Sequence, residues 1–334
     1  MRRLTIPKKT VLAATLLLGF AAGFAATQGH EEGPDVADTA SLRTAADDGS
    51  KSPEELQMTV HVNSQNSQGI IRANGADLYY ELRGDGPPVL FIQGATGDGG
   101  TFEQVAERLA DEFTVVTYHR RGNSRSPRPP GWESTSVHEQ ADDAAALIQA
   151  LELAPAAVFG TSAGAVIVLN LLLRHPEVLR GAIVHEPPLV PVLSNAEETG
   201  AMLQRMIEEG MAQGGPRGAM ELFIRVNAGD ENFENLDPEL RERMLGNAEV
   251  FFSTELEAFF SYLPDAGALA GVKVPVQVVA GVGSRDGYYH EAAAWVAQQL
   301  GTELREIPGA HTPYLDRPLE TAEALRPILQ GFSR

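Results

Sequence analysis

The chain contains no cysteine. Disulfide bonds, thiolate metal sites, a cysteine nucleophile and a lipid-modified N-terminal cysteine are therefore excluded. Positive charge is also scarce, because 26 lysine and arginine residues stand against 45 aspartate and glutamate residues, which gives a formal net charge of −19. A surface this acidic repels nucleic acid and anionic lipid, so we expect no nucleic-acid partner.

The apolar run near the N-terminus is shorter than a typical membrane-spanning helix. Four basic residues near the start precede an apolar stretch from about Val11 to Ala26, which is shorter than the roughly 20 residues of a full span. Gly23 and Ala25 are small residues with the spacing of a cleavage site after Ala25. We predict a signal peptide at 1–25 and a secreted protein. The alternative is an uncleaved segment that tethers the protein to a membrane.

Residues 27–69 contain no phenylalanine, tryptophan or tyrosine and are rich in polar and acidic residues. Such a segment buries too little apolar surface to offset the entropy lost on ordering. We therefore predict a disordered linker at 26–69 and one folded domain at 70–334.

Within that domain, short apolar runs alternate with helical patterns. "PPVLFIQG", "FTVVTYHRRG", "AAVFG" and "VPVQVVAG" are typical of buried strands, and Asn74-Gly75 favours a hairpin turn before them. This alternation predicts an α/β fold, with a mostly parallel sheet covered by helices on both faces. Residues 188–264 have only helical patterns, so we predict a helical lid inserted there.

The segment "GTSAG" places Ser162 between a predicted strand and a predicted helix. A G-x-S-x-G sequence in this context indicates a sharp turn that exposes a nucleophilic serine above the sheet. A phosphate-binding loop would need G-x-x-x-x-G-K-[ST] or G-x-G-x-x-G, and neither motif is present around Ser162. We therefore expect a serine nucleophile, with neither cofactor nor metal.

A serine needs a base, and the base needs an acid to orient it. His311 follows the last predicted strand in "REIPGAHTPYL", whereas His119 and His185 lie at strand ends as possible bystanders. Asp286, in "VVAGVGSRDGYY", is the preferred acid because the chain order nucleophile, acid, histidine is then kept. Glu186, at the end of an earlier strand, is the alternative.

The oxyanion formed during acyl transfer needs two backbone N–H donors. One is expected from Ala163, directly after the nucleophile, and the other from Ala95 in the loop "IQGATGDGG" that follows the first buried strand. Four nearby arginines (Arg120, Arg121, Arg125 and Arg128) indicate either a solvated loop held by carboxylates or a site for an acidic group of the substrate.

Together, "FIQGATGDGGTF", "FTVVTYHRRGNSRS", "VFGTSAGAVIVLN", "VVAGVGSRD" and "PGAHTPYLDRP" resemble the α/β-hydrolase superfamily, in its form with an inserted helical lid. The resemblance covers residues 70–334 and implies an eight-stranded sheet with a cleft between the sheet edge and the lid. It departs from the family where Gln93 stands for a usual histidine, His119 for a usual aspartate and Ser124 for a usual glycine.

We therefore predict a serine hydrolase that acts on a small-molecule ester or related acyl substrate, with no stable protein partner inferred. Lid aromatics are candidates for an acyl pocket or for packing of the lid: Phe251, Phe252, Phe259, Phe260 and Tyr262. Two alternatives stay open. The same triad serves cofactor-free haloperoxidase, perhydrolase or carbon–carbon bond hydrolase chemistry, and a non-catalytic binding protein can keep the fold.

Overall fold

The computed structural model describes residues 66–333. The predicted signal peptide at 1–25 and nearly all of the predicted linker at 26–69 lie outside the described residues. Strand β1 (Asn66–Ala73) begins inside the predicted linker, so the folded domain starts before residue 70. Its first residues are polar, and side chains along β1 alternate between exposed and half-buried, which explains why no apolar pattern marked its start.

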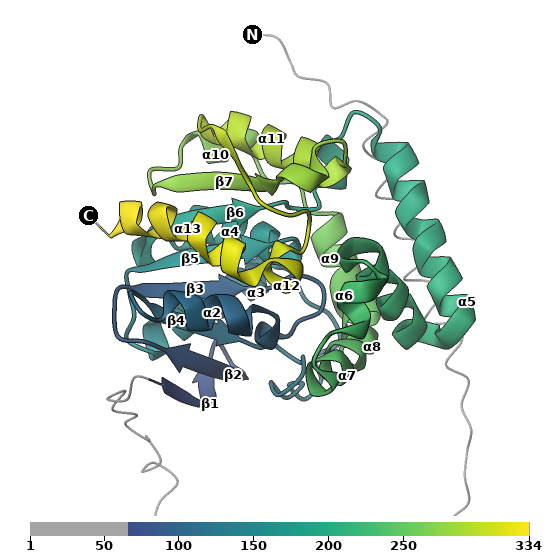
Figure 1. Cartoon of the computed structure of the whole chain (residues 1–334), viewed down its shortest axis with the longest axis horizontal. Helices are drawn as coiled ribbons and strands as arrows, with labels where there is room; N and C mark the ends of the chain where they lie inside the picture. The colour runs from purple at the N-terminus through teal and green to yellow at the C-terminus, as the bar shows by residue number, and fades with distance from the viewer. Residues whose placement is uncertain (1–65, 334) are drawn as a thin grey trace, which may run out of the picture.

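Eight strands form one sheet in the order β1-β2-β4-β3-β5-β6-β7-β8. Strand β2 pairs antiparallel with β1 and β4, and all remaining pairs are parallel. The predicted mostly parallel sheet is therefore confirmed (Figure 1). The strands after β1 are β2 (Ala76–Arg83), β3 (Pro88–Ile92), β4 (Thr114–Tyr118), β5 (Ala156–Thr161), β6 (Leu179–His185), β7 (Val276–Gly281) and β8 (Leu304–Ile307).

The turn between β1 and β2 is the predicted Asn74-Gly75 hairpin. Both residues have a positive φ, 45° at Asn74 and 74° at Gly75. Two consecutive positive φ values give a turn whose twist matches that of the flanking strands, and asparagine and glycine tolerate them best. The register places Ala73 opposite Ala76 on either side of the turn.

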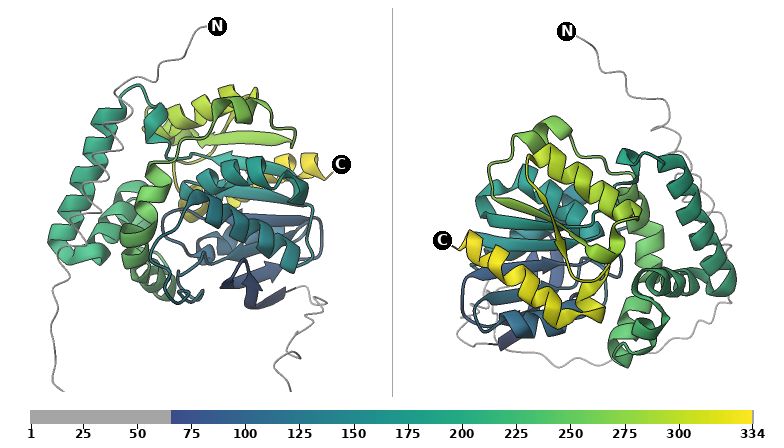
Figure 2. Two further views of the ribbon diagram at one scale, coloured as in Figure 1. Left: turned by 180° about the vertical axis from the view of Figure 1, so that it is seen from behind. Right: turned by 45° about the horizontal axis from the view of Figure 1, so that its top comes forward.

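Helices cover both faces of the sheet. Apolar side chains of α3, α4 and α11 pack on one face, and those of α2 and α13 pack on the other (Figures 1 and 2). The central strands β4 and β5 are buried at every position, which is why they form continuous apolar runs in the sequence. These helices are α2 (Glu103–Leu109), α3 (Val137–Ala150), α4 (Ala163–Arg174), α11 (Tyr288–Leu300) and α13 (Pro318–Phe332).

The chain between β6 and β7 is helical and stands beside the sheet (Figure 2). Its long helix α5 (Ala196–Ala228) is interrupted by non-helical backbone at Gly214 and Gly215, just before Pro216. The other elements of this insertion are η3 (Val190–Val192), α6 (Asp230–Glu234), α7 (Pro238–Gly246), α8 (Ala248–Val250), η4 (Phe251–Glu255), α9 (Leu256–Phe260) and α10 (Ala266–Ala270). We call residues 188–264 the lid.

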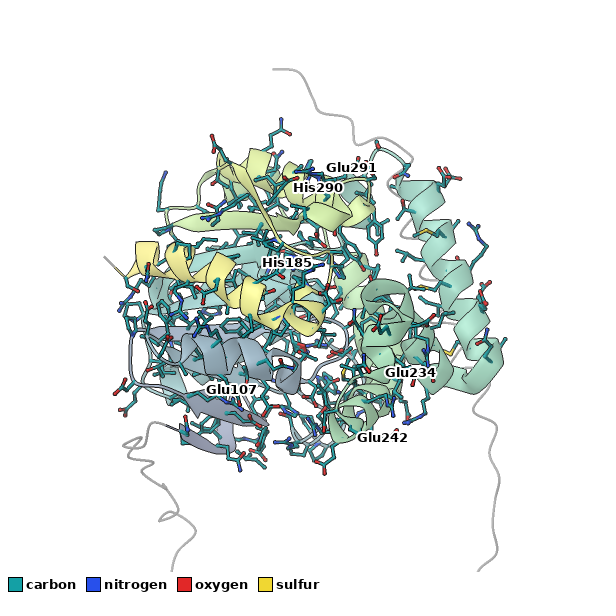
Figure 3. All side chains as sticks on the ribbon, in the orientation of Figure 1. Glu107, His185, Glu234, Glu242, His290 and Glu291 are labelled. Carbon is teal, nitrogen blue, oxygen red and sulfur yellow. The ribbon has the colours of Figure 1, made fainter. Side chains whose placement is uncertain are left out.

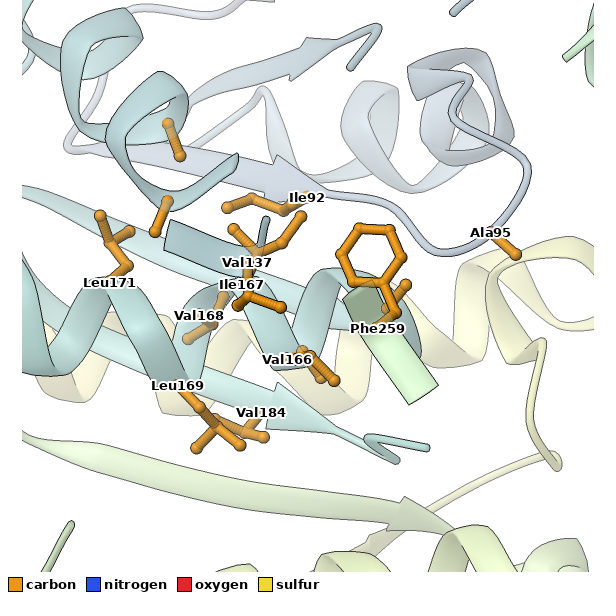
Figure 4. Close-up of a cluster of buried hydrophobic side chains, with 14 of the residues drawn as sticks. Ile92, Ala95, Val137, Val166, Ile167, Val168, Leu169, Leu171, Val184 and Phe259 are labelled. Carbon is orange, nitrogen blue, oxygen red and sulfur yellow. The ribbon is translucent and has the colours of Figure 1, made fainter. Parts of the chain in front are cut away.

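The lid and the sheet share one apolar core. Phe259 of α9 belongs to the same buried cluster as Ile92 of β3 and Val166 of α4, and Figure 4 draws this group of side chains. Among residues 66–333, no helix combines the length and the apolar character that crossing a membrane requires.

Candidate active site

Ser162 occupies a sharp turn between β5 and α4. Its backbone has φ 55° and ψ −126°, a region that non-glycine residues rarely adopt. A Cβ added at Gly160 would lie 2.4 Å from the carbonyl oxygen of Gly164, and one added at Gly164 would lie 2.1 Å from that of Ile92. The turn therefore closes only because both flanking positions are glycine. Strain of this kind costs of order 1–3 kcal/mol and is typical of functional positions.

His311 and Glu186 meet at the same edge of the sheet. His311 follows β8, and its Nδ1 lies 2.7 Å from Oε2 of Glu186. Glu186 directly follows His185, the last residue of β6; its φ is 47° and its side chain is fully buried. The second carboxylate oxygen, Oε1, accepts a hydrogen bond of 2.8 Å from the backbone N–H of Gly281. Both oxygens of Glu186 are thus held, and one of them orients His311.

This geometry corrects the sequence-based choice of acid. Asp286, the preferred candidate, is an exposed residue between η5 (Val282–Ser284) and α11. The chain leaves β7 through η5 and carries Asp286 to the surface, whereas Glu186 turns back over the sheet edge as soon as β6 ends. Glu186, the alternative acid, is the residue that contacts His311.

The electrostatics of the buried pair favour an ionised Glu186. Burial by itself would raise the pKa of Glu186, but His185 and the hydrogen bonds from His311 and Gly281 lower it to about 2. Burial lowers the pKa of His185 to about 4, so this histidine is neutral at pH 7. The two hydrogen bonds are therefore the part of the stabilisation that persists at neutral pH.

An ionised Glu186 also fixes the tautomer of His311. A carboxylate only accepts hydrogen bonds, so Nδ1 of His311 carries the proton and Nε2 keeps a free lone pair. Two rings also stack on the imidazole of His311: the ring centroid of Tyr289 in α11 lies 3.4 Å from that of His311, and the ring centroid of His185 lies 6.2 Å from it. Figure 3 labels His185 in the middle of the molecule. Tyr289, the second residue of α11, was not among the residues predicted from the sequence.

Ser162 and His311 line one small cavity beneath the lid. Its free space is about 30 Å³, enough for water-sized molecules. Ser162 Oγ makes no hydrogen bond to His311 among the contacts of the described residues, a common situation in unliganded hydrolases. The remaining lining is formed by Gly94, Ala95, Thr96, Thr101, Phe223, Ile224, Asn227, Met244, Thr312, Tyr314 and Leu315.

One predicted oxyanion donor, Ala95, lines this cavity, and the other, Ala163, directly follows Ser162 in the chain. Ala163 is the first residue of α4, so its N–H has no acceptor within the helix. Ala95 lines the cavity, in a loop that passes so close to the nucleophile that a Cβ added at Gly94 would lie 2.9 Å from Cβ of Ser162. Ala163 thus adjoins Ser162 in the chain, and the Gly94–Ala95 segment lies against it.

A family model described as the alpha/beta hydrolase fold matches residues 87–318, more than half of the chain. The chain belongs to the alpha/beta hydrolase family. Among curated relatives, the uncharacterized hydrolase YraK of Bacillus subtilis is 36% identical over 268 residues, which cover 79% of this chain and 96% of that protein. A zearalenone hydrolase of Bionectria ochroleuca is 28% identical over 254 residues, 75% of this chain and 92% of the relative.

Solved structures of alpha/beta hydrolases share the fold. A thermophilic esterase from Thermogutta terrifontis superposes with a TM-score of 0.64 at 24% identity, covering 80% of this chain and 99% of that one. A structure described as a putative epoxide hydrolase from Pseudomonas aeruginosa gives a TM-score of 0.65 at 19% identity, with 80% and 96% covered. At these identities the likeness concerns architecture alone.

The lid aromatics of this alpha/beta hydrolase pack mainly into the core. Phe251, Phe252, Phe259 and Phe260 are buried, and the cavity at Ser162 does not include them among its lining residues. Phe252 and Tyr262 instead line a separate cavity of about 830 Å³ between the lid and the ends of α3 and α4. Packing of the lid, one of the two roles expected of these rings, is therefore what the buried phenylalanines do, and Phe223, Ile224 and Met244 supply the lid's apolar contacts at Ser162.

Carboxylates of the chain hold most of the arginine cluster. Arg121 pairs with Asp143, and Arg125 pairs with Glu81. Arg128 lies over the ring of Trp132. Arg120 is fully buried against Glu255, so the picture of a solvated loop fails for this residue.

Proposed function

We propose that this alpha/beta hydrolase is a carboxylic-ester hydrolase that works through Ser162, His311 and Glu186. The observation that carries the proposal is the His311–Glu186 hydrogen bond of 2.7 Å at a cavity that Ser162 also lines. It leaves Nε2 of His311 free to accept a proton on the side away from Glu186. A base oriented by a buried acid and placed beside a strained serine is the arrangement that serine acyl transfer requires.

In the first half-reaction, Oγ of Ser162 attacks the ester carbonyl carbon while its proton moves to Nε2 of His311. The carbonyl oxygen becomes an oxyanion, which accepts hydrogen bonds from the N–H groups of Ala95 and Ala163. The C–O bond to the alcohol then breaks, and His311 gives its proton to the leaving oxygen. Each oxyanion donor contributes roughly 3–4 kcal/mol, judged from removal of such donors in other hydrolases.

In the second half-reaction, water attacks the acyl group on Ser162. His311 accepts a proton from the water and returns one to Oγ of Ser162 as the carboxylic acid leaves. Glu186 stays ionised throughout and stabilises the imidazolium that His311 becomes in both steps, since the hydrogen bonds from His311 and Gly281 hold the pKa of Glu186 below its usual range.

We test this with a fluorophosphonate probe, which phosphonylates only an activated serine, and map the modified peptide by mass spectrometry. The expected result is labelling at Ser162 that is lost in the His311→Ala variant, together with turnover of p-nitrophenyl esters that Ser162→Ala abolishes. Zearalenone belongs in the ester panel because a relative is named zearalenone hydrolase. Turnover that survives in Ser162→Ala would contradict the proposal.

We further propose that the protein is exported, as its N-terminal pattern of basic residues, apolar stretch and small residues near Ala25 favours. Mass spectrometry of the protein recovered from its native host tests this. A mature N-terminus at Ala26 is expected, and an intact N-terminus in the membrane fraction would support a tether instead.

A further inference from the structure

Arg120, which follows β4, forms a buried three-way contact beneath the active site. Its Nη1 and Nη2 donate hydrogen bonds of 2.9 Å to the two carboxylate oxygens of Glu255, and Nη2 also donates one of 3.0 Å to the carbonyl oxygen of Gly94. The side chains of Arg120 and Glu255 are both fully buried. The guanidinium group also lies 5.1 Å from the centre of the Phe259 ring. This arginine is therefore engaged within the protein and is not presented to a substrate.

The contact with Gly94 bears directly on the oxyanion donor. The carbonyl of Gly94 and the N–H of Ala95 belong to the same peptide group. In a planar trans peptide these two bonds point in opposite directions. Because Arg120 holds the Gly94 carbonyl on one side, the N–H of Ala95 is turned to the other side. The peptide lies against Ser162, as the close approach of Gly94 to the serine shows.

The backbone around Arg120 supports the same loop. The N–H of Arg120 donates to the carbonyl of Gly97, and the N–H of Gly97 donates to the carbonyl of Gly94. The Gly94 carbonyl thus accepts two hydrogen bonds, one of them from a buried cation. Accepting from a cation also polarises the peptide, which makes the Ala95 N–H a stronger donor.

The partner that holds Arg120 comes from the lid. Glu255 is the last residue of η4, and Asn123 also donates a hydrogen bond of 3.1 Å to it. Removal of the carboxylate that pairs with a buried arginine strongly destabilises the folded protein, because an uncompensated charge stays buried. Seating of the lid and the orientation of Arg120 are therefore linked through Glu255.

We infer that Arg120 is a positioning residue that sets the Ala95 N–H for oxyanion binding, and that Glu255 of the lid holds Arg120 in place. The inference rests on the proposed acyl-transfer function. It assigns a role in turnover to a pair of residues that do not touch the cavity at Ser162.

The test replaces both members of the pair, in the Arg120→Met/Glu255→Met variant, so that neither charge is left buried alone. Such double replacements are often neutral or stabilising. We expect the melting temperature to change by only a few degrees and kcat on a p-nitrophenyl ester to fall by about ten- to a hundredfold, with KM within about twofold. The loss is smaller than for deletion of a whole oxyanion donor, which costs about 10²–10³, because the amide itself remains.

A transition-state analogue supplies a readout that a purely structural role would not move. A trifluoromethyl ketone forms an oxyanion on Ser162, so its inhibition constant should rise by the same factor as kcat/KM falls. The matched control is Arg243→Gln. Nε of Arg243, in the lid, lies 2.8 Å from Oδ2 of Asp98, which belongs to the same loop as Gly94, but within residues 66–333 no hydrogen bond joins Arg243 to the Gly94–Ala95 peptide. We expect this control to keep kcat within about threefold.

Wild-type kcat in the folded double variant would overturn the inference. So would an equal loss of kcat in Arg243→Gln, since the effect would then belong to lid attachment in general. If the double variant does not fold, Arg120→Leu/Glu255→Leu decides: its apolar pair cannot donate to the Gly94 carbonyl, so full kcat there refutes the role. Turnover that persists in Ser162→Ala would instead refute the proposed function and is a separate outcome.

Discussion

Replacement of Glu186 by glutamine tests the site most sharply, because the structure dictates what the new side chain does. The N–H of Gly281 donates to Oε1 of Glu186, and Oε2 faces Nδ1 of His311 at 2.7 Å. In Glu186→Gln, the amide oxygen is required opposite Gly281, so the amide NH2 faces His311. Nδ1 then becomes an acceptor, and the proton moves to Nε2.

A proton on Nε2 removes the base from the reaction, because His311 can no longer accept the proton of Ser162. The variant also loses the negative charge that stabilises the imidazolium. An acid-to-amide replacement in a serine protease triad lowers kcat by about 10⁴, and we expect a loss of about 10³–10⁴ here, or roughly 4–5.5 kcal/mol in activation free energy. The glutamine fills the same volume, so the melting temperature should change little.

Initial rates on a p-nitrophenyl ester measure the effect, and fluorophosphonate labelling of Ser162 confirms it independently. Asp286→Asn is the matched control, since Asp286 is exposed and should keep kcat within about twofold. More than a tenth of wild-type kcat in Glu186→Gln, or an equally severe loss in Asp286→Asn, would refute the assignment of Glu186 as the orienting acid.

Three further predictions concern stability and the support of the histidine. Gly164→Ala places a methyl group 2.1 Å from a backbone oxygen of β3 and should lower the free energy of unfolding in urea by about 3 kcal/mol or more, whereas Gly331→Ala, in open space on α13, should be neutral or stabilising. Tyr289→Ala removes the ring stacked on His311 and should lower kcat about tenfold, while Tyr289→Phe keeps the ring and should stay within about threefold. The pKa of His185 is about 4 in the folded protein, against 6.5 ordinarily, so on acidification the unfolded chain binds a proton at this residue before the folded protein does. The free energy of unfolding should therefore fall by up to about 3 kcal/mol as the pH drops from 6.5 to 4. His185→Asn should make the free energy of unfolding less dependent on pH in this range.

Much of the fold was predictable because its causes are local. The all-buried strand β5 forms a continuous apolar run, and Asn74-Gly75 has the two residue types that tolerate the backbone of its turn. The turn at Ser162 was predictable for the same reason, since glycine is the only residue type that fits at positions 160 and 164. Each of these features depends on a few consecutive residues.

The carboxylate that contacts His311 was not predictable, because Asp286 and Glu186 both follow strands that end at the same edge of the sheet. What separates them is the backbone after each strand. Glu186 has a φ of 47° and turns over the edge, whereas η5 carries Asp286 to the surface. A positive φ at a glutamate leaves no mark in the sequence, since the residue type does not favour it.

The buried ion pair between Arg120 and Glu255 is a long-range feature that the sequence indicates only in part. Glu255 stands in "VFFSTELEAFF", among phenylalanines that all turn out to be buried, and Arg120 stands two residues after the end of the buried strand β4. A charge in such surroundings is tolerated only when an opposite charge meets it there. Glu257 stands in the same stretch and is exposed, so only the fold shows that Glu255 is the buried carboxylate and that Arg120, 135 positions away, is its partner. Asp98, in the loop after β3, is likewise fully buried and pairs with Arg243 of the lid at 2.8 Å, although Arg243 itself is only partly buried, so here too the partner is identified by the fold.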